Sequence, residues 1–296
     1  MSDVLLELLG LLRLEAIGVN RFRGHAQDLG FRNLFGGQVL GQSLSAAIQT
    51  LTQQGWVPHS LHAYFLRPGN VDDSLEFEVQ IIRDGRTFCT RQVTASQNGK
   101  AILTMLSSFH KPEKGFEHMP VMPDVKGPEG IPSQLELARM FKDFFSEKVR
   151  DKYTADTPIE QRVLNPINIF APKKADPVKY VWMKADSKMG DNTNDHLTML
   201  AYASDFNFIT TALHPHAVSV TQKDMQVASL DHSIWFHRPF RMDEWLLYAI
   251  DSPTASGGRG FCRGQFFNEK GELVASTAQE GLMRQRTVVS ETIKGE

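Results

Sequence analysis

The chain repeats one pattern of residues, and this internal repeat constrains its fold more than any other feature of the sequence. The segment Phe65–Pro68 recurs as Phe236–Pro239, and Gly85–Cys89 recurs as Gly258–Cys262. Subtracting the first positions gives offsets of 171 and 173 residues for the two pairs. Because the offset stays nearly constant over roughly 40 residues, the sequence predicts two copies of one domain.

The length of the chain agrees with such a duplication. Its 296 residues can form two domains of about 110 to 130 residues, each large enough to bury a core. Five prolines break regular structure between residues 111 and 133. We therefore expect an N-terminal domain over residues 1–110, a proline-rich linker with an amphipathic helix over 111–177, and a C-terminal domain over 178–296.

Each half predicts the same order of secondary structure. A helix is expected over residues 38–50, after the pair Gly36-Gly37, and its counterpart over 197–213. Turns such as Asn98-Gly99 separate alternating segments that are typical of antiparallel strands. The expected strands cover 60–66, 75–83, 87–97 and 101–110 in the first half, and 178–185, 227–236, 244–252, 260–268 and 273–283 in the second. This pattern indicates an α+β fold.

Two further helices are expected outside the repeat. Near the N-terminus, Asp3 precedes an apolar run, and we expect it to cap a short docking helix. In the linker, Ser133 is expected to cap an amphipathic helix with an apolar stripe of five large residues. The stripe consists of Leu137, Met140, Phe141, Phe144 and Phe145.

Charge and composition exclude several classes of partner. The 32 basic and 34 acidic residues give a formal charge of -2, which provides no general attraction to nucleic acid. No stretch approaches the roughly 18 apolar residues of a membrane span. Cys89 and Cys262 occupy equivalent positions of the repeat, so we expect them to pack in a reducing compartment and not to form a disulfide. The cytoplasm is the expected location.

Asp205 is the first candidate for chemistry, because it places a carboxylate in the apolar helical run 200–209. Burying an ionised carboxylate without partners is costly, so a buried one needs hydrogen bonds or a neutral form. A position on the solvent face of the helix, or a cap on a kink, is the alternative. The sequence pattern leaves both interpretations open.

The polar stretch 227–238 contains the second candidate, Ser229. Strict alternation along a strand would place Ser229 on the same face as Asp231 and on the face opposite His232. A serine there can act as a nucleophile or hold a water molecule. The sequence contains no Gly-x-Ser-x-Gly motif, so the nucleophile of a typical serine hydrolase lacks support.

Other polar or small residues fit a structural role better. Four histidines near the repeated strands lack the close ligand spacing of a zinc site, so no metal is predicted. Glycines at the start of the first helix do not match a dinucleotide or P-loop motif, and no cofactor is predicted. A catalytic cysteine is also disfavoured. The residues concerned are His59, His62, His232, His237, Gly36, Gly37, Gly41, Cys89 and Cys262.

Four stretches of the sequence are long and uncommon: Leu34–Gln42, His62–Gly69, Leu230–Phe240 and Gln279–Gly281. Together they resemble the acyl-CoA thioesterase II family, over nearly the whole chain. The resemblance implies a double hotdog fold, in which a curved antiparallel sheet wraps a long helix in each half. It also implies hydrolysis of fatty acyl-CoA to free fatty acid and CoA without a metal, cofactor or covalent intermediate. The implied assembly is a homo-oligomer, expected to be a tetramer.

The family uses an Asp, a Thr or Ser, and a Gln to hold and activate water, and the matching positions are Asp205, Ser229 and Gln279. The resemblance implies that Asp205 is the general base and that the other two residues align the water. Gly36 and Gly37 are candidate oxyanion donors, because backbone N–H groups point outward at the start of a helix. His59 matches a histidine that has been considered catalytic in the family, and we interpret it as structural or supporting.

The two copies differ at these positions. Gln279 stands opposite Ser107 in the repeat, and the helix 38–50 has no carboxylate in its interior. We therefore expect the catalytic residues to lie wholly in the second half. A dehydratase would need a histidine paired with a carboxylate, and His196 is poorly placed, nine residues before Asp205. The remaining alternative is a non-catalytic acyl-CoA binding or sensing protein.

Overall fold

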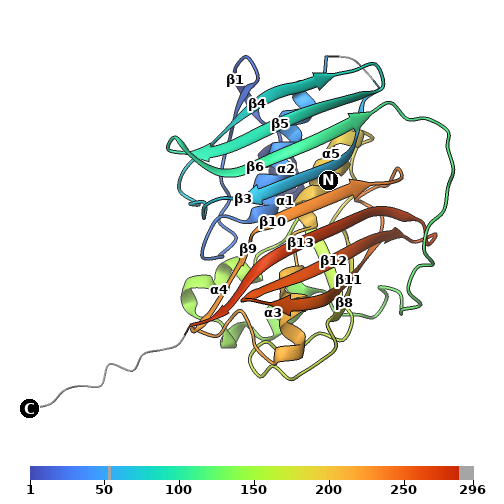
Figure 1. Cartoon of the computed structure of the whole chain (residues 1–296). Coiled ribbons are helices and arrows are strands. Elements are labelled where there is room, and N and C mark those ends of the chain that lie inside the picture. Colours follow the sequence, from blue (N-terminus) through green and yellow to red (C-terminus); the bar gives the residue numbers. More distant parts are fainter. Residues whose placement is uncertain (53–54, 287–296) are drawn as a thin grey trace, which may run out of the picture.

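The computed structural model describes residues 1–52 and 55–286, so the last ten residues of the expected C-terminal domain lie outside the described part. Thirteen strands of the described chain form one large sheet (Figure 1). Twelve of them follow the order β1-β2-β4-β5-β6-β3-β10-β13-β12-β11-β8-β7, and β9 pairs with β13. All of the paired strands are antiparallel. The expected α+β class is confirmed.

The repeat is visible in the order of the elements. Each half has a helix, α2 (Gly36–Gln49) or α5 (Thr193–Ala203), on the same side of the sheet (Figure 1). The strands of the first half are β3 (Val57–Phe65), β4 (Leu75–Asp84), β5 (Phe88–Gln97) and β6 (Lys100–His110). Those of the second are β8 (Val178–Ala185), β9 (Met225–Ser229), β10 (Asp231–Phe236), β11 (Leu246–Ser256), β12 (Arg259–Asn268) and β13 (Leu273–Gln285). The expected strands are therefore confirmed to within a few residues, except that one of them is split at Leu230.

The two halves join edge to edge in the middle of the sheet. Strand β3 pairs with β10 so that Tyr64 lies opposite Asp231 and Ser60 opposite Trp235. This pairing leaves no free edge between the copies, and an unpaired edge would expose unsatisfied backbone groups. The inner faces of both halves consequently contribute to one continuous apolar core.

Helices α2 and α5 run antiparallel and touch through glycines. A Cβ atom on Gly37 would lie 2.2 Å from the carbonyl oxygen of Tyr202, and one on Gly41 would lie 2.9 Å from the carbonyl oxygen of Thr198. Only glycine allows the two backbones to approach this closely. The contact brings the N-terminal end of α2 to the C-terminal end of α5.

The expected helix over 197–213 is wrong in its extent. Helix α5 ends at Ala203, residues 204–208 form turns, and a 3₁₀ segment, η2 (Ile209–His216), follows. Asn207 adopts the left-handed conformation with φ of 64°, and the Ser204 hydroxyl donates to the Ala201 carbonyl. Short polar side chains that bond to the nearby backbone compete with the helical pattern. Asp205 therefore lies in a turn and not in the interior of a helix.

The linker contains more structure than expected. Ser133 and Glu136 form a capping box at the start of α3 (Gln134–Met140), which confirms the predicted cap. The helix ends after seven residues, and two separate elements follow it, η1 (Lys142–Phe144) and α4 (Glu147–Thr154). The prediction of one amphipathic helix that carries all five apolar residues was therefore wrong. Strand β7 (Ile159–Val163) then pairs with β8.

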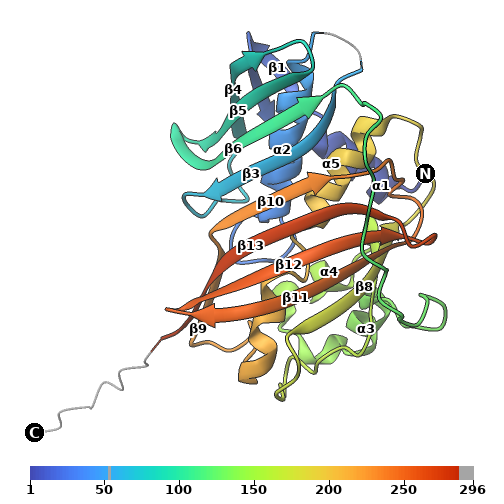
Figure 2. The same ribbon diagram turned by 45° about the vertical axis from the view of Figure 1, so that its right-hand side comes forward.

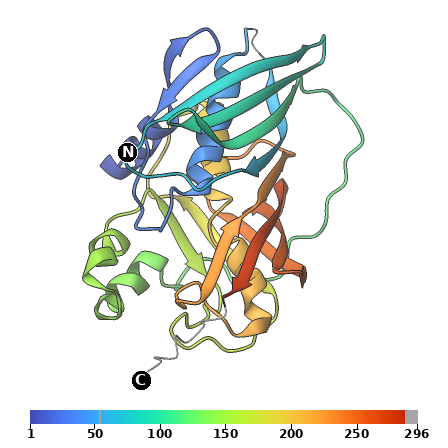
Figure 3. The same ribbon diagram turned by 60° about the vertical axis from the view of Figure 1, so that its left-hand side comes forward.

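The proline-rich part of the linker crosses the outer face of the second half, in front of the strands in Figure 2 and opposite α3 and α4 in Figure 3. Met122, Val125 and Ile131 pack there against a small apolar cluster that includes Trp182 and Phe267. The Trp182 indole N–H also donates to the carbonyl oxygen of Lys126 at 2.9 Å. The proline-rich part of the linker thus covers apolar surface of the second half.

At the N-terminus, α1 (Asp3–Leu12) docks through four buried leucines, as expected. Its cap is Ser2, whose hydroxyl accepts from the Leu5 N–H, so the assignment to Asp3 was wrong by one residue. Strands β1 (Glu15–Gly18) and β2 (Arg21–Gly24) were not predicted because each has only four residues. Cys89 and Cys262 are buried and unpaired, which confirms the packing interpretation. No helix of the described residues is long and apolar enough to cross a membrane.

The helix contact predicts a sharp contrast between two glycine substitutions. Gly37→Ala should lower the free energy of unfolding by about 1–3 kcal/mol, because the new methyl group would overlap the Tyr202 carbonyl. Gly10→Ala in α1 is the matched control, since nothing lies within 4 Å of its added Cβ. That variant should gain about 0.5–1 kcal/mol from helix propensity. Urea unfolding of both proteins measures the difference, and equal stability would contradict the proposed close contact.

Candidate active site

The site is organised around the carboxylate of Asp205, whose side chain is 7% exposed. Its Oδ1 atom accepts a hydrogen bond from Gln279 Nε2 at 3.0 Å and one from Ser229 Oγ at 3.5 Å. Its Oδ2 atom accepts from the backbone N–H of Gly37 at 2.9 Å. The three residues selected from the sequence therefore lie together, and Gly37 joins them.

The three candidate catalytic residues belong to the second half, but one further group that contacts Asp205 comes from the first half. Asp205 comes from the turn after α5, Gln279 from β13 and Ser229 from β9, but Gly37 belongs to the first turn of α2. The N-terminus of a helix carries unpaired N–H groups and a partial positive charge, both of which favour a carboxylate. The close contact between α2 and α5 delivers this helix end to Asp205.

A strand irregularity turns Ser229 toward the site. Ser229 pairs with Gly281, whereas Ser233 pairs with Ala278. An advance of four residues from Ser229 to Ser233 therefore matches an advance of only three residues along β13. The extra residue is a β-bulge, which reverses the alternation of side chains beyond it. Ser229 consequently faces inward, on the same side as the buried Gln279, and the expected common face with Asp231 was wrong.

Burial dominates the electrostatics of Asp205. Removal from water raises the pKa of its carboxyl group, while the hydrogen bonds from Gln279, Gly37 and Ser229 act in the opposite direction. His232 Nδ1 lies 4.0 Å from Asp205 Oδ1. However, burial lowers the pKa of His232 to about 3, so the imidazole is neutral and the contact is not an ion pair.

His232 is a residue of the site that sequence reasoning treated as structural. It is fully buried, and its Nε2 atom lies 2.9 Å from the Ser204 hydroxyl. The repeat held a signal that could have identified it. The offset of 171 aligns His232 with Leu61. This inward position is therefore apolar in the first half and polar in the second, which is also the half that contains Gln279.

The glycine pair has a more specific role than a general oxyanion site. The N–H of Gly37 is already bonded to Asp205. A Cβ on Gly36 would lie 2.8 Å from Asp205 Oδ2 and 3.0 Å from the Phe65 ring. Both glycines therefore allow the backbone to approach the carboxylate, and a role in oxyanion binding stays a prediction.

His59 lies among other partners. Its Nε2 atom is 2.8 Å from Ser108 Oγ, and its ring meets Phe88 and His110 edge to face. None of these contacts is with the groups around Asp205. The interpretation of His59 as structural or supporting stays a prediction that agrees with this geometry.

The first half holds different chemistry at the corresponding place. The buried Arg91 donates from Nε to Thr50 Oγ1 at 2.9 Å and pairs with Asp84 at 2.7 Å. Ser107, the counterpart of Gln279, donates to the Arg91 carbonyl at 3.4 Å. An arginine thus occupies the interior of the first half near the end of α2, where the second half has its carboxylate.

The site is not arranged as a metal centre. Within residues 1–52 and 55–286, no three His, Cys, Asp or Glu side chains converge to hold a metal ion. The groups that contact Asp205 are hydrogen-bond donors, which suit an anion or a proton acceptor and not a cation. The donor set is therefore one that holds a buried carboxylate.

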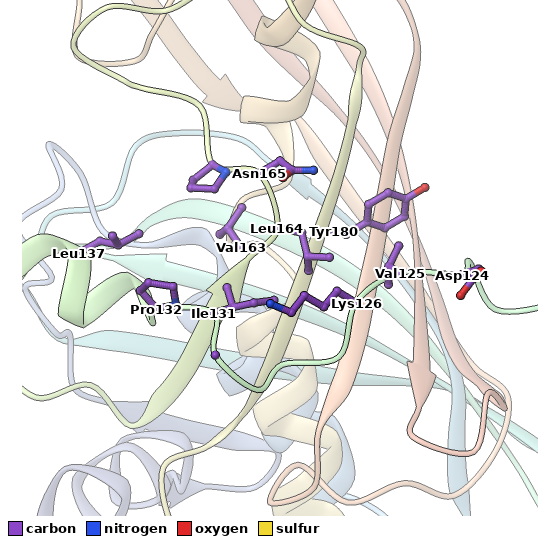
Figure 4. Close-up of a pocket in the computed structure, with 12 residues that line it drawn as sticks. Asp124, Val125, Lys126, Ile131, Pro132, Leu137, Val163, Leu164, Asn165 and Tyr180 are labelled. Atoms are coloured by element: carbon purple, nitrogen blue, oxygen red, sulfur yellow. The ribbon is translucent and has the colours of Figure 1, made fainter.

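A separate hollow lies at the edge of the second half, between the linker and β7 and β8 (Figure 4). It has a volume of about 510 Å³ and is lined largely by apolar residues. Val125, Ile131, Leu137, Leu164 and Tyr180 form much of its wall. The lining includes none of the residues that contact Asp205, so this hollow is distinct from the candidate active site.

Each half of the chain matches a known protein family. A family described as acyl-CoA thioesterase matches residues 148–282, and one described as acyl-CoA thioesterase N-terminal domain matches residues 25–110. Acyl-CoA thioesterase 2 of Haemophilus influenzae is 44% identical, with 96% of this chain and 99% of that protein covered. Human acyl-coenzyme A thioesterase 8 is 34% identical, with 95% and 90% covered.

Solved structures show the same architecture. The acyl-CoA thioesterase II TesB2 of Mycobacterium marinum is 36% identical and superimposes with a TM-score of 0.76, covering 95% of this chain and 98% of that one. A hotdog-fold protein of Alicyclobacillus acidocaldarius, 20% identical, has a TM-score of 0.75 and covers 94% and 98%. The expected tandem hotdog fold is confirmed.

The buried carboxylate predicts an unusual dependence of stability on pH. The folded protein holds the Asp205 proton at pH values where the unfolded chain has lost it, so ionisation of Asp205 costs stability as pH rises through its raised pKa. Asp205→Asn removes this cost. Its Tm should therefore increase relative to that of the unsubstituted protein as the pH rises above about 4, the pKa of Asp in the unfolded chain.

The control for this experiment is Asp151→Asn in α4, which neutralises an exposed carboxylate that forms no ion pair within residues 1–52 and 55–286. Its Tm difference should stay nearly constant over the same pH range. Thermal unfolding of the three proteins provides the comparison. A constant difference for Asp205→Asn as well would show that Asp205 does not keep its proton in the folded state.

Proposed function

The chain belongs to the acyl-CoA thioesterase II family, and from that premise we propose that Asp205, Ser229 and Gln279 activate a water molecule for the hydrolysis of fatty acyl-CoA. The protein is an acyl-CoA thioester hydrolase. The observation that supports this assignment of roles is the convergence of three donors on one buried carboxylate. The products are a free fatty acid and CoA.

In the proposed mechanism, Asp205 acts as the general base. The water oxygen attacks the thioester carbonyl carbon while one proton of the water moves to the carboxylate. The tetrahedral intermediate then collapses with cleavage of the C–S bond, and the departing CoA sulfur takes the proton back from Asp205. No bond forms between protein and acyl group, and a positioned base of this kind contributes about 10²- to 10⁴-fold.

Ser229 and Gln279 orient the water in this proposal. Both already donate toward Asp205 Oδ1, so a water bound beside that oxygen would lie between two further polar groups. Alignment of the attacking oxygen lowers the entropic cost of the reaction. The N–H of Gly36, at the start of α2, is the proposed donor to the oxyanion. The N–H of Gly37, the other candidate from the sequence, is bonded to Asp205 and could serve the oxyanion only by leaving that carboxylate.

Thiol release from acyl-CoAs of graded chain length tests this proposal. Asp205→Asn should lower kcat by about 10²- to 10⁴-fold, because it removes the base. Gln279→Ala should cost less, about 10- to 100-fold, as expected for one hydrogen bond to a charged group. Ser229→Ala should also lower kcat, whereas Ser229→Thr, which retains the hydroxyl, should preserve most of it.

The outcomes separate the alternatives. Near-normal turnover by Asp205→Asn would rule out its role as the base. Binding of acyl-CoA without any thiol release would favour the non-catalytic binding or sensing protein. Loss of activity in both Ser229 variants would point to packing and not to the hydroxyl group.

We also propose that the protein works in the cytoplasm as a homo-oligomer, with a tetramer as the implied state. An exposed apolar strip on the outer face of the sheet supports this proposal. It includes Tyr64, Leu106 and Trp235, which are 61%, 45% and 37% exposed, and His62, whose ring lies 5.2 Å from that of Trp235. The linker covers the outer face of the second half but not this strip, and apolar patches of this kind are typical of interfaces.

Tyr64→Glu should weaken the association, because it buries an unpaired charge in the interface between copies. Light scattering should therefore show a smaller assembly than for the unsubstituted protein at the same concentration. Phe116→Glu changes an apolar residue of the linker that is even more exposed than Tyr64 and should leave the assembly intact. A monomeric unsubstituted protein would contradict the proposal directly.

A further inference from the structure

His232 and Gln279 are neighbours across two strands of the sheet. Ser233 pairs with Ala278, so the adjacent inward-facing residues are His232 on β10 and Gln279 on β13. Both side chains are completely buried. In the described part of the chain, two buried atoms of this pair have no hydrogen-bond partner, His232 Nδ1 and Gln279 Oε1.

We propose that His232 is a positioning residue that carries its proton on Nδ1, donates it to Gln279 Oε1, and thereby holds the amide with Nε2 toward Asp205. The inference rests on the proposed function, because the orientation of Gln279 matters only if Gln279 serves the reaction. His232 acts through Gln279 and takes no part in proton transfer.

The other arrangements of this pair are less favourable. If the proton were on Nε2, the bare Nδ1 atom would face Gln279 Oε1 and lie 4.0 Å from Asp205 Oδ1, and all three would be acceptors. If the amide were reversed, its oxygen would lie where Nε2 now is, 3.0 Å from Asp205 Oδ1. Two acceptors at that distance repel each other, and buried polar atoms without partners are costly.

The remaining contacts of His232 agree with a proton on Nδ1. The Ser204 hydroxyl oxygen lies 2.9 Å from both the Ala201 carbonyl oxygen and His232 Nε2. Its one hydrogen can rotate from the carbonyl to Nε2, and the proposal requires that it is donated to Nε2. The nearby side chain of Gln279 raises the pKa of His232 against the effect of burial, as expected of an acceptor within reach of a ring N–H. Since that pKa still falls to about 3, the imidazole stays neutral and carries one ring proton, whose position is set by the hydrogen bonds of the two nitrogens.

The duplication offers an internal comparison. In the first half, the same two strand positions are Leu61 and Ser107, which are also direct partners across neighbouring strands. Both members of the pair differ between the copies, and only the half with Asp205 has His and Gln. This joint difference is expected if the two residues form one functional unit.

Two isosteric substitutions separate the roles of the ring nitrogens. The amide nitrogen of asparagine is two bonds from Cβ, as Nδ1 is, whereas that of glutamine is three bonds away, as Nε2 is. His232→Asn should therefore keep kcat within about threefold, and His232→Gln and His232→Leu should lose about 10-fold or more, as for one hydrogen bond. KM should change little in all three. Equal activity of the Asn and Gln variants would overturn the role of Nδ1.

A double substitution tests whether His232 acts through Gln279. In a Gln279→Ser background, His232→Leu should lower kcat by less than about twofold further, because the amide to be positioned is gone. Additive losses would overturn the inference. The acid limb of the pH profile of kcat/KM should move to higher pH in His232→Leu, since the Gln279 donor lowers the pKa of Asp205. A merely destabilised protein would not show this shift.

A measurement without turnover distinguishes this inference from the proposed function. In protein labelled with ¹⁵N-histidine, the resonances that disappear in His232→Asn identify His232. Their chemical shifts should show a protonated Nδ1 and an unprotonated Nε2. A proton on Nε2 would overturn the positioning role even if Gln279 proves essential. A protonated Nδ1 together with a silent Gln279→Ala would instead refute the proposed role of Gln279.

Discussion

The burial of the Asp205 carboxylate is the constraint on which the rest of the structure depends. A carboxylate removed from water needs hydrogen-bond donors at both oxygens, and no single segment of the chain supplies them. Gln279 and Ser229 provide donors for one oxygen, and Gly37 provides one for the other. The site can form only where the second-half strands and the first-half helix meet.

The start of α2 can lie this close to α5 and to Asp205 because two of its residues are glycines. Gly37 lets the first turn of α2 approach the Tyr202 carbonyl, and Gly36 leaves room for the carboxylate itself. The same turn contributes N–H groups and the positive end of the helix dipole. Packing of the two helices and electrostatic stabilisation of the Asp205 carboxylate are therefore consequences of one contact.

The two copies keep a common framework while their interiors have diverged. Alignment by Cys89 and Cys262 places Arg91 opposite Gly264. A Cβ on Gly264 would lie 2.3 Å from the Tyr248 ring, so that ring fills the space an arginine occupies in the first half. The Tyr248 hydroxyl in turn donates to the carbonyl oxygen of Ser204 at 2.9 Å. The aromatic residue thus supports the turn that carries Asp205.

The sequence by itself determined the duplication, the α+β class, most of the strands and the choice of Asp205, Ser229 and Gln279 as candidates, because repeats, alternation and family motifs are local patterns. It did not determine where α5 ends, since the bonds of Ser204 and the conformation of Asn207 override an apolar helical pattern. Only the tertiary structure decided that a bulge turns Ser229 inward and that Gly37 completes the site. Both depend on pairing and packing between residues far apart in the chain, which no local pattern encodes.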